Sequence, residues 1–428
     1  MSTLNNFKSL GELSKLDYIT ETHIQGMIGD INNPLLNLPL KNNLDMICGD
    51  GSVTFTRSTT GTYIDRYGVV KSAAINTPRF EKEGLLVEGP STNKCLQSED
   101  FSTTWGKTRS SISTNAINAP NGNATADKLT EDSTAANSHN TYQPITTAVG
   151  NLTGSIFLKK GTRTKTRLTI YNATDGHLGE TFFDLDAGLV ISGSGSIKKL
   201  ANDWYRCSIS AIVTDVSNYF TCYMVNDAGS AYYDGDGSSY LYLWGAQLEE
   251  LPFSTSYIHT TTAAVTRNIE YGIVSTYVNN IPAIYNANIK PEDLTMICDF
   301  DVLGHISDDF QYIINIDGVG FTLMVASMPT SNRVYIYYGN PVSVSGSSVE
   351  VNKLYRLGFT YNTQLDQIKT YLDGEFKLSR IGNNINTSGD SGYTIMLGSI
   401  NWGRTLYGHM KNFKIYDKAF SENEIKLA

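Results

Sequence analysis

The chain has 428 residues, 42 of them acidic and 33 basic, which gives a formal net charge of −9 at pH 7. Because no basic block is present, binding to nucleic acid or to an anionic lipid surface is not expected. No run reaches the roughly 18 apolar residues of a membrane span, so we expect no membrane insertion. With 26 tyrosines, 37 glycines and only 18% charged residues, the composition favours short strands joined by polar turns.

Residues 1–45 differ in pattern from the rest. Ser9 and Glu12 have the spacing of a capping box, and apolar residues follow at Leu13, Leu16 and Ile19. This predicts one or two short helices, followed by an extended tether. Such short helices cannot bury their apolar face alone. The segment therefore either packs on the first β domain or serves as an attachment and oligomerisation segment, and the second interpretation is preferred.

Residues 46–100 form a block of short predicted strands. Val53, Phe55 and Arg57 alternate with threonines, which predicts a strand. Gly68 suits the turn of a hairpin formed by residues 62–65 and 69–71. Residues 84–89 predict another short strand between glycines.

Residues 101–267 predict a β-sandwich of the jelly-roll type, because strand patterns recur at regular spacing with Gly, Asn and Asp turns between them. The expected strands are 155–159, 167–171, 181–185, 204–211, 219–225 and 240–244. Gly245 is expected to end the last strand, and Pro252 to begin an extended connector.

Residues 268–428 predict a second sandwich, so the fold class is all-β, with two jelly-roll domains and a short, partly helical N-terminal segment. Asp373-Gly374 is a strong hairpin signal. Ser421 and Glu424 have capping-box spacing and predict a last helical turn. The expected strands are 294–302, 311–316, 321–325, 334–338, 354–361, 367–372, 394–397 and 410–416.

The five cysteines are widely spaced and include no Cys-x-x-Cys pair. This pattern is neither a disulfide framework nor a zinc site. We expect buried thiols in a protein that is assembled in a reducing cytoplasm.

The chain resembles known families in two regions, and the first runs from Val53 to Asn268. The residues that carry the resemblance are Phe55-Thr56-Arg57-Ser58-Thr59, Gly61-Thr62-Tyr63, Pro78-Arg79-Phe80, Gly84-Leu85-Leu86-Val87-Glu88, Ser98-Glu99-Asp100-Phe101, Trp204-Tyr205-Arg206, Leu243-Trp244-Gly245-Ala246-Gln247-Leu248-Glu249 and Thr255-Ser256-Tyr257-Ile258. In these residues the region is similar to bacteriophage tail and tail-fibre proteins that carry a carbohydrate-binding-module-like jelly roll. We expect the two ends of this region, near Arg57 and Arg267, to lie side by side at the base of the jelly roll.

The second region resembles laminin-G or concanavalin A-like lectin domains. This resemblance implies a two-sheet jelly roll that binds, usually, glycans. The residues that carry it are Arg356-Leu357-Gly358-Phe359-Thr360-Tyr361, Tyr371-Leu372-Asp373-Gly374, Leu397-Gly398, Phe413-Lys414-Ile415-Tyr416-Asp417 and Phe420-Ser421.

Enzymes of that fold place carboxylates on one strand in a Glu-x-Asp-x-x-Glu pattern, which is absent from the sequence. Asp299 and Asp301 share a strand face, but no third acid accompanies them, so a structural or solvent-facing role is expected. The six histidines stand singly. We therefore expect no enzymatic activity and no certain cofactor.

Asp234 and Asp236 alternate with glycines. Carboxylates in such a loop can bind a structural Ca²⁺, although the terminal Glu of an EF-hand is missing. Asp-Gly pairs are also ordinary turn residues, and the plain turn is the preferred interpretation.

Sugars bind by stacking on aromatic rings, with polar side chains reaching their hydroxyl groups. Several such residues lie in polar, loop-like sequence where exposure is expected, although each single Tyr can equally be a half-buried strand residue. The candidate glycan-binding residues are Trp105, Tyr232, Tyr233, Trp402, Arg404 and Tyr407.

Together these features predict a virion protein, a tail-fibre or receptor-binding subunit that adheres to a host surface glycan without chemistry. The N-terminal segment would contact other virion proteins, and a homotrimer would cover strand edges and add avidity. The alternatives are a structural virion subunit, such as a collar, baseplate or capsid decoration, and a glycan-degrading tailspike.

Overall fold

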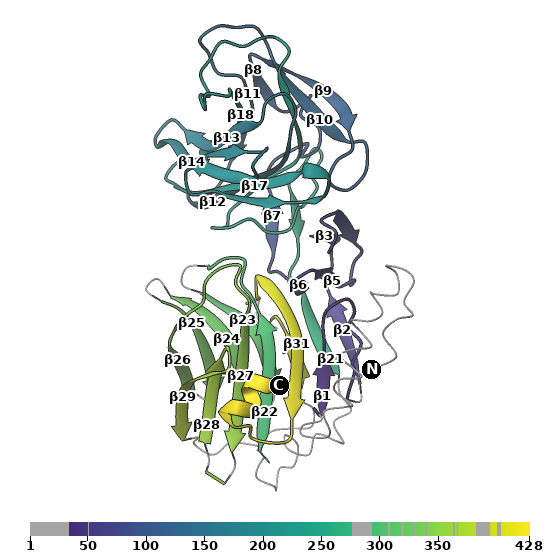
Figure 1. Cartoon of the computed structure of the whole chain (residues 1–428), viewed down its shortest axis with the longest axis vertical. Coiled ribbons are helices and arrows are strands. Elements are labelled where there is room, and N and C mark those ends of the chain that lie inside the picture. The colour runs from purple at the N-terminus through teal and green to yellow at the C-terminus, as the bar shows by residue number, and fades with distance from the viewer. Residues whose placement is uncertain are drawn as a thin grey trace, which may run out of the picture.

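The computed structural model describes residues 34–428 except 50, 276–292, 307–308, 318–320, 329–330, 339, 363, 366, 382–393 and 400–403. The all-β prediction is confirmed, because two β-sandwiches are stacked along the long axis of the molecule (Figure 1). The helices predicted within residues 1–33 lie outside the described residues.

The upper sandwich of Figure 1 consists of two six-stranded antiparallel sheets. In spatial order, sheet 1 contains β16 (Ser196–Lys199), β17 (Tyr205–Val213), β12 (Gly150–Lys160), β19 (Tyr240–Glu249), β10 (Ala126–Glu131) and β9 (Ser110–Ile117). Sheet 2 contains β15 (Leu189–Ser192), β14 (Gly176–Asp184), β13 (Lys165–Asn172), β18 (Ser217–Val225), β11 (Asn140–Thr146) and β8 (Gly106–Thr108). Alternate residues of both sheets meet in one apolar core that includes Ile156, Leu168, Phe220 and Leu243.

The lower sandwich also has two antiparallel sheets. Sheet 3 contains β29 (Glu375–Ile381), β28 (Gln367–Leu372), β27 (Tyr355–Asn362), β22 (Leu294–Phe300), β31 (Gly408–Tyr416), β6 (Gly84–Val87) and β5 (Arg79–Glu81), and β1 (Leu36–Leu38) also pairs with β31. Sheet 4 contains β2 (Ser52–Thr56), β21 (Tyr271–Ser275), β30 (Thr394–Leu397), β23 (Asp309–Asp317), β24 (Phe321–Met328), β25 (Ser331–Tyr338) and β26 (Asn340–Ser348).

The lower sandwich is therefore built from both ends of the chain, and the upper sandwich is inserted between β6 and β21. We expected residues 46–100 to stand apart as a block and the second sandwich to begin at 268. Instead, Leu85 pairs with Met410, and Phe55 pairs with Gly272. Strand β6 of this block is fully buried and has a partner on each side, β5 and β31, whereas β2 pairs with β21 at the edge of sheet 4.

A neck of two small sheets joins the sandwiches: β3 (Gly61–Ile64) with β4 (Val70–Ala73), and β7 (Ser91–Asn93) with β20 (Val265–Arg267). The hairpin predicted around Gly68 is confirmed as β3–β4. Its Val70 and Ile64 pack with Trp204 and Trp244 of the upper sandwich.

A cluster of buried ion pairs fills the neck. Arg57 Nη1 lies 2.7 Å from Glu270, and Arg79 contacts both Glu270 and Glu88, the latter at 2.7 Å. Arg267 Nη1 lies 3.0 Å from the same Glu88. The prediction that the regions around Arg57 and Arg267 lie side by side is confirmed, because shared carboxylates join them.

Gly245 does not end its strand, as the sequence led us to expect. Strand β19 continues to Glu249, and the register against β12 shifts between Ser155 and Phe157. Gly245 has φ +64°, and a Cβ there would lie 2.8 Å from the Phe157 ring. It therefore marks a β-bulge inside the strand, where only glycine fits without strain.

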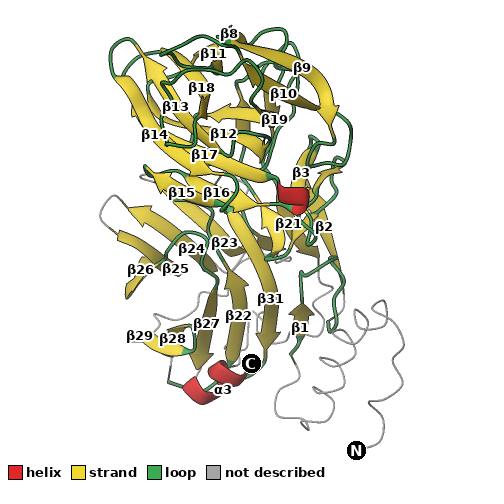
Figure 2. Cartoon of the chain, turned by 45° about the horizontal axis from the view of Figure 1, so that its top comes forward, coloured by secondary structure: helices red, strands yellow, loops and turns green. Residues whose placement is uncertain are grey.

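Two local predictions near the C-terminus are confirmed. Asp373-Gly374 joins β28 to β29, and Ser421 caps α3 (Glu422–Leu427), with Glu424 completing the capping box. This helix, red in Figure 2, covers part of the outer face of sheet 3, where Ile425 packs with Ile297 and Tyr371. In the described part of the chain, no helix is long and apolar enough to span a membrane. All five cysteines are unpaired, four of them are buried, and Cys48 is half-buried.

Candidate functional site

The outer face of sheet 2 carries two strands with the same alternating pattern. Strand β18 presents Tyr219 and Tyr223 on either side of Thr221, while the intervening Phe220 and Cys222 enter the core. Strand β13 repeats this with Arg167 and Tyr171. Sheet 1 packs toward the neck, so the outer face of sheet 2 points away from the lower sandwich (Figure 1).

The aromatic rings on this face form one continuous group, which we call the tyrosine platform (Tyr142, Tyr171, His177, Tyr219 and Tyr223). Ring centroids lie 5.9 Å apart for Tyr142 and Tyr219, 6.0 Å for Tyr171 and Tyr219, 5.0 Å for Tyr171 and His177, and 6.5 Å for His177 and Tyr223. Tyr171 and His177 are exposed, and the other three are half-buried. Such partly exposed rings in contact offer a broad, shallow apolar surface.

Polar groups border the tyrosine platform on one side. The Arg167 guanidinium stacks on Tyr223 at 3.8 Å from the ring centroid and forms an ion pair of 3.1 Å with Glu180. Burial and the nearby Arg167 lower the pKa of His177 below its usual 6.5, so its imidazole is neutral at pH 7. Apolar rings beside a cation, a carboxylate and a neutral imidazole suit a flat ligand with hydroxyl groups at its edge.

A cleft of about 780 Å³ lies between the two sandwiches. Its lining comes from the neck, from sheet 1 and from the lower sandwich, and it includes many hydroxyl groups but few aromatic rings. Representative lining residues are Tyr63, Glu81, Glu83, Ser196, Arg206, Ser208, Thr255, Asp301, His305 and His409.

His409 lies between two buried carboxylates of the cleft. Its Nδ1 is 2.9 Å from Asp301 Oδ1, and its Nε2 is 3.4 Å from Glu81 Oε2. Burial disfavours the imidazolium, but the hydrogen bonds with Asp301 and Glu81 outweigh burial and raise the pKa of His409 to about 10. His409 thus stands alone in the sequence but lies between two carboxylates in the fold.

Three of the predicted glycan-binding residues are buried, so the expectation that they are exposed is wrong. Trp105 packs on Phe101 at 4.7 Å and donates its indole N–H to the Leu96 carbonyl. Tyr233 donates its hydroxyl to Glu131 at 2.6 Å.

Tyr407 is the third buried residue, and it donates its hydroxyl to the Pro90 carbonyl at 3.1 Å. In all three cases the polar residues nearby in the sequence suggested exposure, but the aromatic side chain is buried and anchors a loop to the core.

The remaining predicted residues are scattered. Tyr232 is exposed and lies outside the tyrosine platform, Arg404 is exposed on the lower sandwich, and Trp402 lies outside the described residues. Asp234 and Asp236 each accept hydrogen bonds from nearby turn residues. Asp234 accepts a hydrogen bond from the Ala136 amide, and Asp236 accepts from the Ser239 amide and hydroxyl, as turn residues do.

Asp299 and Asp301 are both buried and both paired. Asp299 Oδ1 lies 2.7 Å from Arg356 Nε and also accepts from Asn412, whereas Asp301 contacts His409. Their carboxylates therefore hold sheet 3 together.

Sequence reasoning missed the tyrosine platform, although a signal was present. The strings Tyr219-Phe220-Thr221-Cys222-Tyr223 and Arg167-Leu168-Thr169-Ile170-Tyr171 both alternate apolar residues with aromatic or cationic ones. Because neighbouring antiparallel strands align such alternations on one face, the two strings predict a shared aromatic surface.

Comparison with known proteins supports the fold of the lower sandwich. Residues 300–426 match the family model of the concanavalin A-like lectin/glucanases superfamily. This part of the chain is therefore similar to concanavalin A-like lectin domains. No curated protein matches the chain.

Solved structures give weaker likenesses. The chain is similar to the binding domain of botulinum neurotoxin serotype D, with 18% identity, a TM-score of 0.28, and coverage of 37% of this chain and 40% of that one. It is also similar to a carbohydrate-binding module of the Ruminococcus gnavus IT-sialidase, solved with α2,3-sialyllactose, with 14% identity, a TM-score of 0.26, and coverage of 32% and 82%. The match thus spans less than half of the neurotoxin domain, and TM-scores this low support no conclusion.

Proposed function

We propose that this protein is a glycan-binding subunit of a bacteriophage tail fibre or receptor-binding appendage, and that it adheres to a host surface glycan without cleaving it. The tyrosine platform carries the binding part of this proposal. It offers stacking surfaces with neighbouring ring centroids 5.0–6.5 Å apart, bordered by Arg167, Glu180 and His177 as hydrogen-bonding groups. The lectin fold of residues 300–426 and the tail-protein resemblance of residues 53–268 support it.

The platform can be tested with an array of bacterial surface glycans. Tyr171→Ala and Tyr219→Ala each remove one stacking ring from the surface of the sheet, so the fold should persist. Loss of one stacked ring corresponds to about 1 kcal/mol, or roughly a 5- to 10-fold weaker Kd. Tyr67→Ala is the matched control, because Tyr67 is 77% exposed at the β3–β4 turn, outside the platform. The proposal is refuted if no glycan binds the native protein, or if the platform variants bind as well as the control variant.

The virion role and the absence of chemistry need separate experiments. Antibody labelling of phage particles should mark a distal appendage, whereas label on the particle body would favour a collar, baseplate or capsid-decoration protein. Incubation with a bound polysaccharide should release no reducing ends. Light scattering should give the mass of three chains, which is the state that provides avidity from weak single sites.

A further inference from the structure

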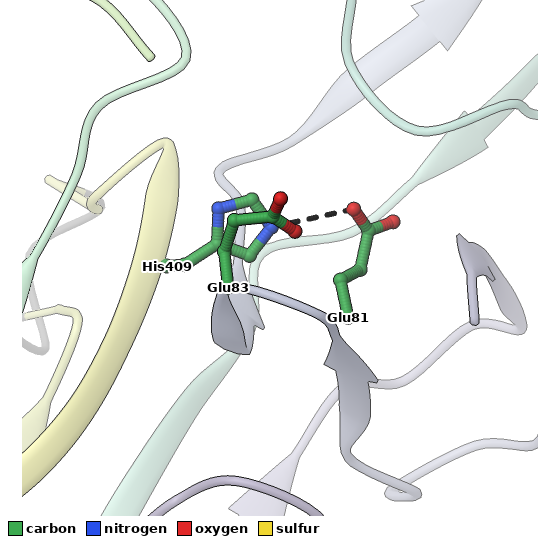
Figure 3. A group of neighbouring side chains, drawn as sticks. All are labelled: Glu81, Glu83 and His409. Carbon is green, nitrogen blue, oxygen red and sulfur yellow. Dashed lines mark hydrogen bonds and ion pairs between the residues drawn. The ribbon is translucent and has the colours of Figure 1, made fainter. Parts of the chain in front are cut away.

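The floor of the cleft between the sandwiches brings together three side chains with metal-binding groups. Glu81 ends β5, Glu83 lies in the turn to β6, and His409 comes from β31, which pairs with β6. One oxygen of each carboxylate and one nitrogen of the imidazole all lie within 4.8 Å of one another. Figure 3 shows both carboxylates facing the same side of the imidazole.

A buried carboxylate orients His409, as is usual for histidines that bind metal ions. Asp301, itself buried, accepts from the main-chain N–H of His409 at 2.8 Å and lies 2.9 Å from Nδ1. This fixes the ring and keeps a proton on Nδ1, so Nε2 points toward Glu81 and Glu83. A carboxylate behind a histidine is the usual outer-shell arrangement of a histidine that coordinates a metal ion.

Glu81 and Glu83 differ in the hydrogen bonds and ion pairs that their carboxylates make. Glu81 is buried and accepts from the Ile64 amide at 2.7 Å, with Lys198 Nζ at 3.4 Å. Within the described part of the chain, no hydrogen bond or ion pair engages the half-buried Glu83 carboxylate. No other hydrogen bond or ion pair of the described residues therefore fixes the position of the Glu83 carboxylate.

From these contacts, we propose that Glu81, Glu83 and His409 bind a divalent transition-metal ion such as Zn²⁺, with its remaining coordination positions open to the cleft. Zn²⁺ binds both imidazole nitrogens and carboxylate oxygens, and a site with three protein ligands keeps water in the fourth position. Ca²⁺ takes six to eight oxygen ligands and fits this set less well.

The distances and charges are compatible with such an ion. Ligand atoms around tetrahedral Zn²⁺ are about 3.4 Å apart, so the present set, which spans up to 4.8 Å, is at most about 1.4 Å too wide. The unengaged Glu83 can rotate to close that gap. The ion would take the place of the proton on His409 Nε2, and Lys198, whose side chain is 52% exposed, can turn toward water.

Such an ion would tie the β5–β6 turn, from the N-terminal part of the chain, to β31 of the lectin-like domain. It would also present open coordination positions to a cleft rich in hydroxyl groups. This inference does not depend on the tyrosine platform, which lies on the opposite sheet of the upper sandwich.

The test uses full-length protein freed of any affinity tag and stripped with a chelator. Isothermal titration with ZnCl₂ should give one site per chain, and Zn²⁺ should raise the melting temperature. Glu83→Gln should weaken binding at least 10-fold while leaving the metal-free melting temperature unchanged, because Gln keeps the shape of the side chain and no hydrogen bond or ion pair of the described residues engages the Glu83 carboxylate. Glu350→Gln, at an exposed glutamate, is the matched control and should bind Zn²⁺ normally.

Asp301→Asn provides a second measurement. Losing the outer-shell carboxylate should weaken Zn²⁺ binding by about 10- to 100-fold without changing the number of sites. The proposal is overturned if stripped native protein shows neither heat nor a melting shift with Zn²⁺. It is equally overturned if Glu83→Gln binds Zn²⁺ as tightly as Glu350→Gln does.

Discussion

Replacing Glu270 by Gln tests whether the buried ion cluster holds the neck together. Glu270 accepts from Arg57 at 2.7 Å, contacts Arg79 and accepts from the Glu88 amide at 3.0 Å. The cluster contains three arginines and two glutamates, so its net charge is +1 before the change and +2 after it. None of these side chains is more than 1% exposed, so water cannot screen the added charge.

The expected loss of unfolding free energy is about 3–5 kcal/mol, the range for removing one partner of a buried ion pair. At roughly 2–4 °C per kcal/mol for domains of this size, the melting temperature should fall by about 6–20 °C. Urea denaturation followed by circular dichroism measures the first value, and differential scanning calorimetry measures the second.

The matched control is again Glu350→Gln. Glu350 pairs with Lys353 on the surface, where its side chain is 67% exposed, so the same chemical change should alter stability by less than about 1 kcal/mol. Hydrogen exchange should place the effect of Glu270→Gln in β2 and β21, which flank the cluster. If Glu270→Gln is no more destabilising than the control, the cluster does not hold the neck.

Three further changes probe other parts of the fold. Burial raises the pKa of Glu88, but the neighbouring arginines outweigh burial and lower it to about 2, so its stabilisation is complete above pH 4.5. About 3 kcal/mol should be lost between pH 4.5 and 2, and urea midpoints should show that Glu88→Gln lacks this component. Trp105→Ala should cost about 3–5 kcal/mol in urea denaturation and leave glycan affinity unchanged, because the ring is buried. Gly245→Ala should lower the melting temperature more than Gly122→Ala, because both have positive φ but only Gly245 has the Phe157 ring in its way.

Local patterns predicted the strands well because each depends on neighbours in sequence. The alternation around Tyr219 and the Asp373-Gly374 turn both appear in the structure as expected. No such local pattern in the sequence indicates that strands from the two ends of the chain pair with each other. Leu85 pairs with Met410 across 325 residues, and a short apolar strand is compatible with many partners.

The candidate sites were harder to predict for a related reason. Trp105 lies among threonines and a glycine, which suggests a loop, but exposure depends on what the loop packs against, here Phe101. His409 and the acids around it come from three distant parts of the sequence, and they become neighbours only because β31 pairs with β6 on one side and with β22 on the other. A spacing search along the sequence cannot detect a cluster of that kind.

The insertion of one sandwich into the other determines how the two candidate binding surfaces are held. Chain segments enter and leave the upper sandwich through β7 and β20, which pair with each other. Just beside this exit and entry, Arg79 contacts Glu88 on one segment and Glu270 on the other. A single flexible linker would let the two sandwiches rotate freely. Here two chain segments are hydrogen-bonded to each other and joined by buried ion pairs, so the orientation of the tyrosine platform relative to the lower sandwich is fixed. In an oligomer, every copy would therefore hold its platform in the same orientation relative to its own lower sandwich.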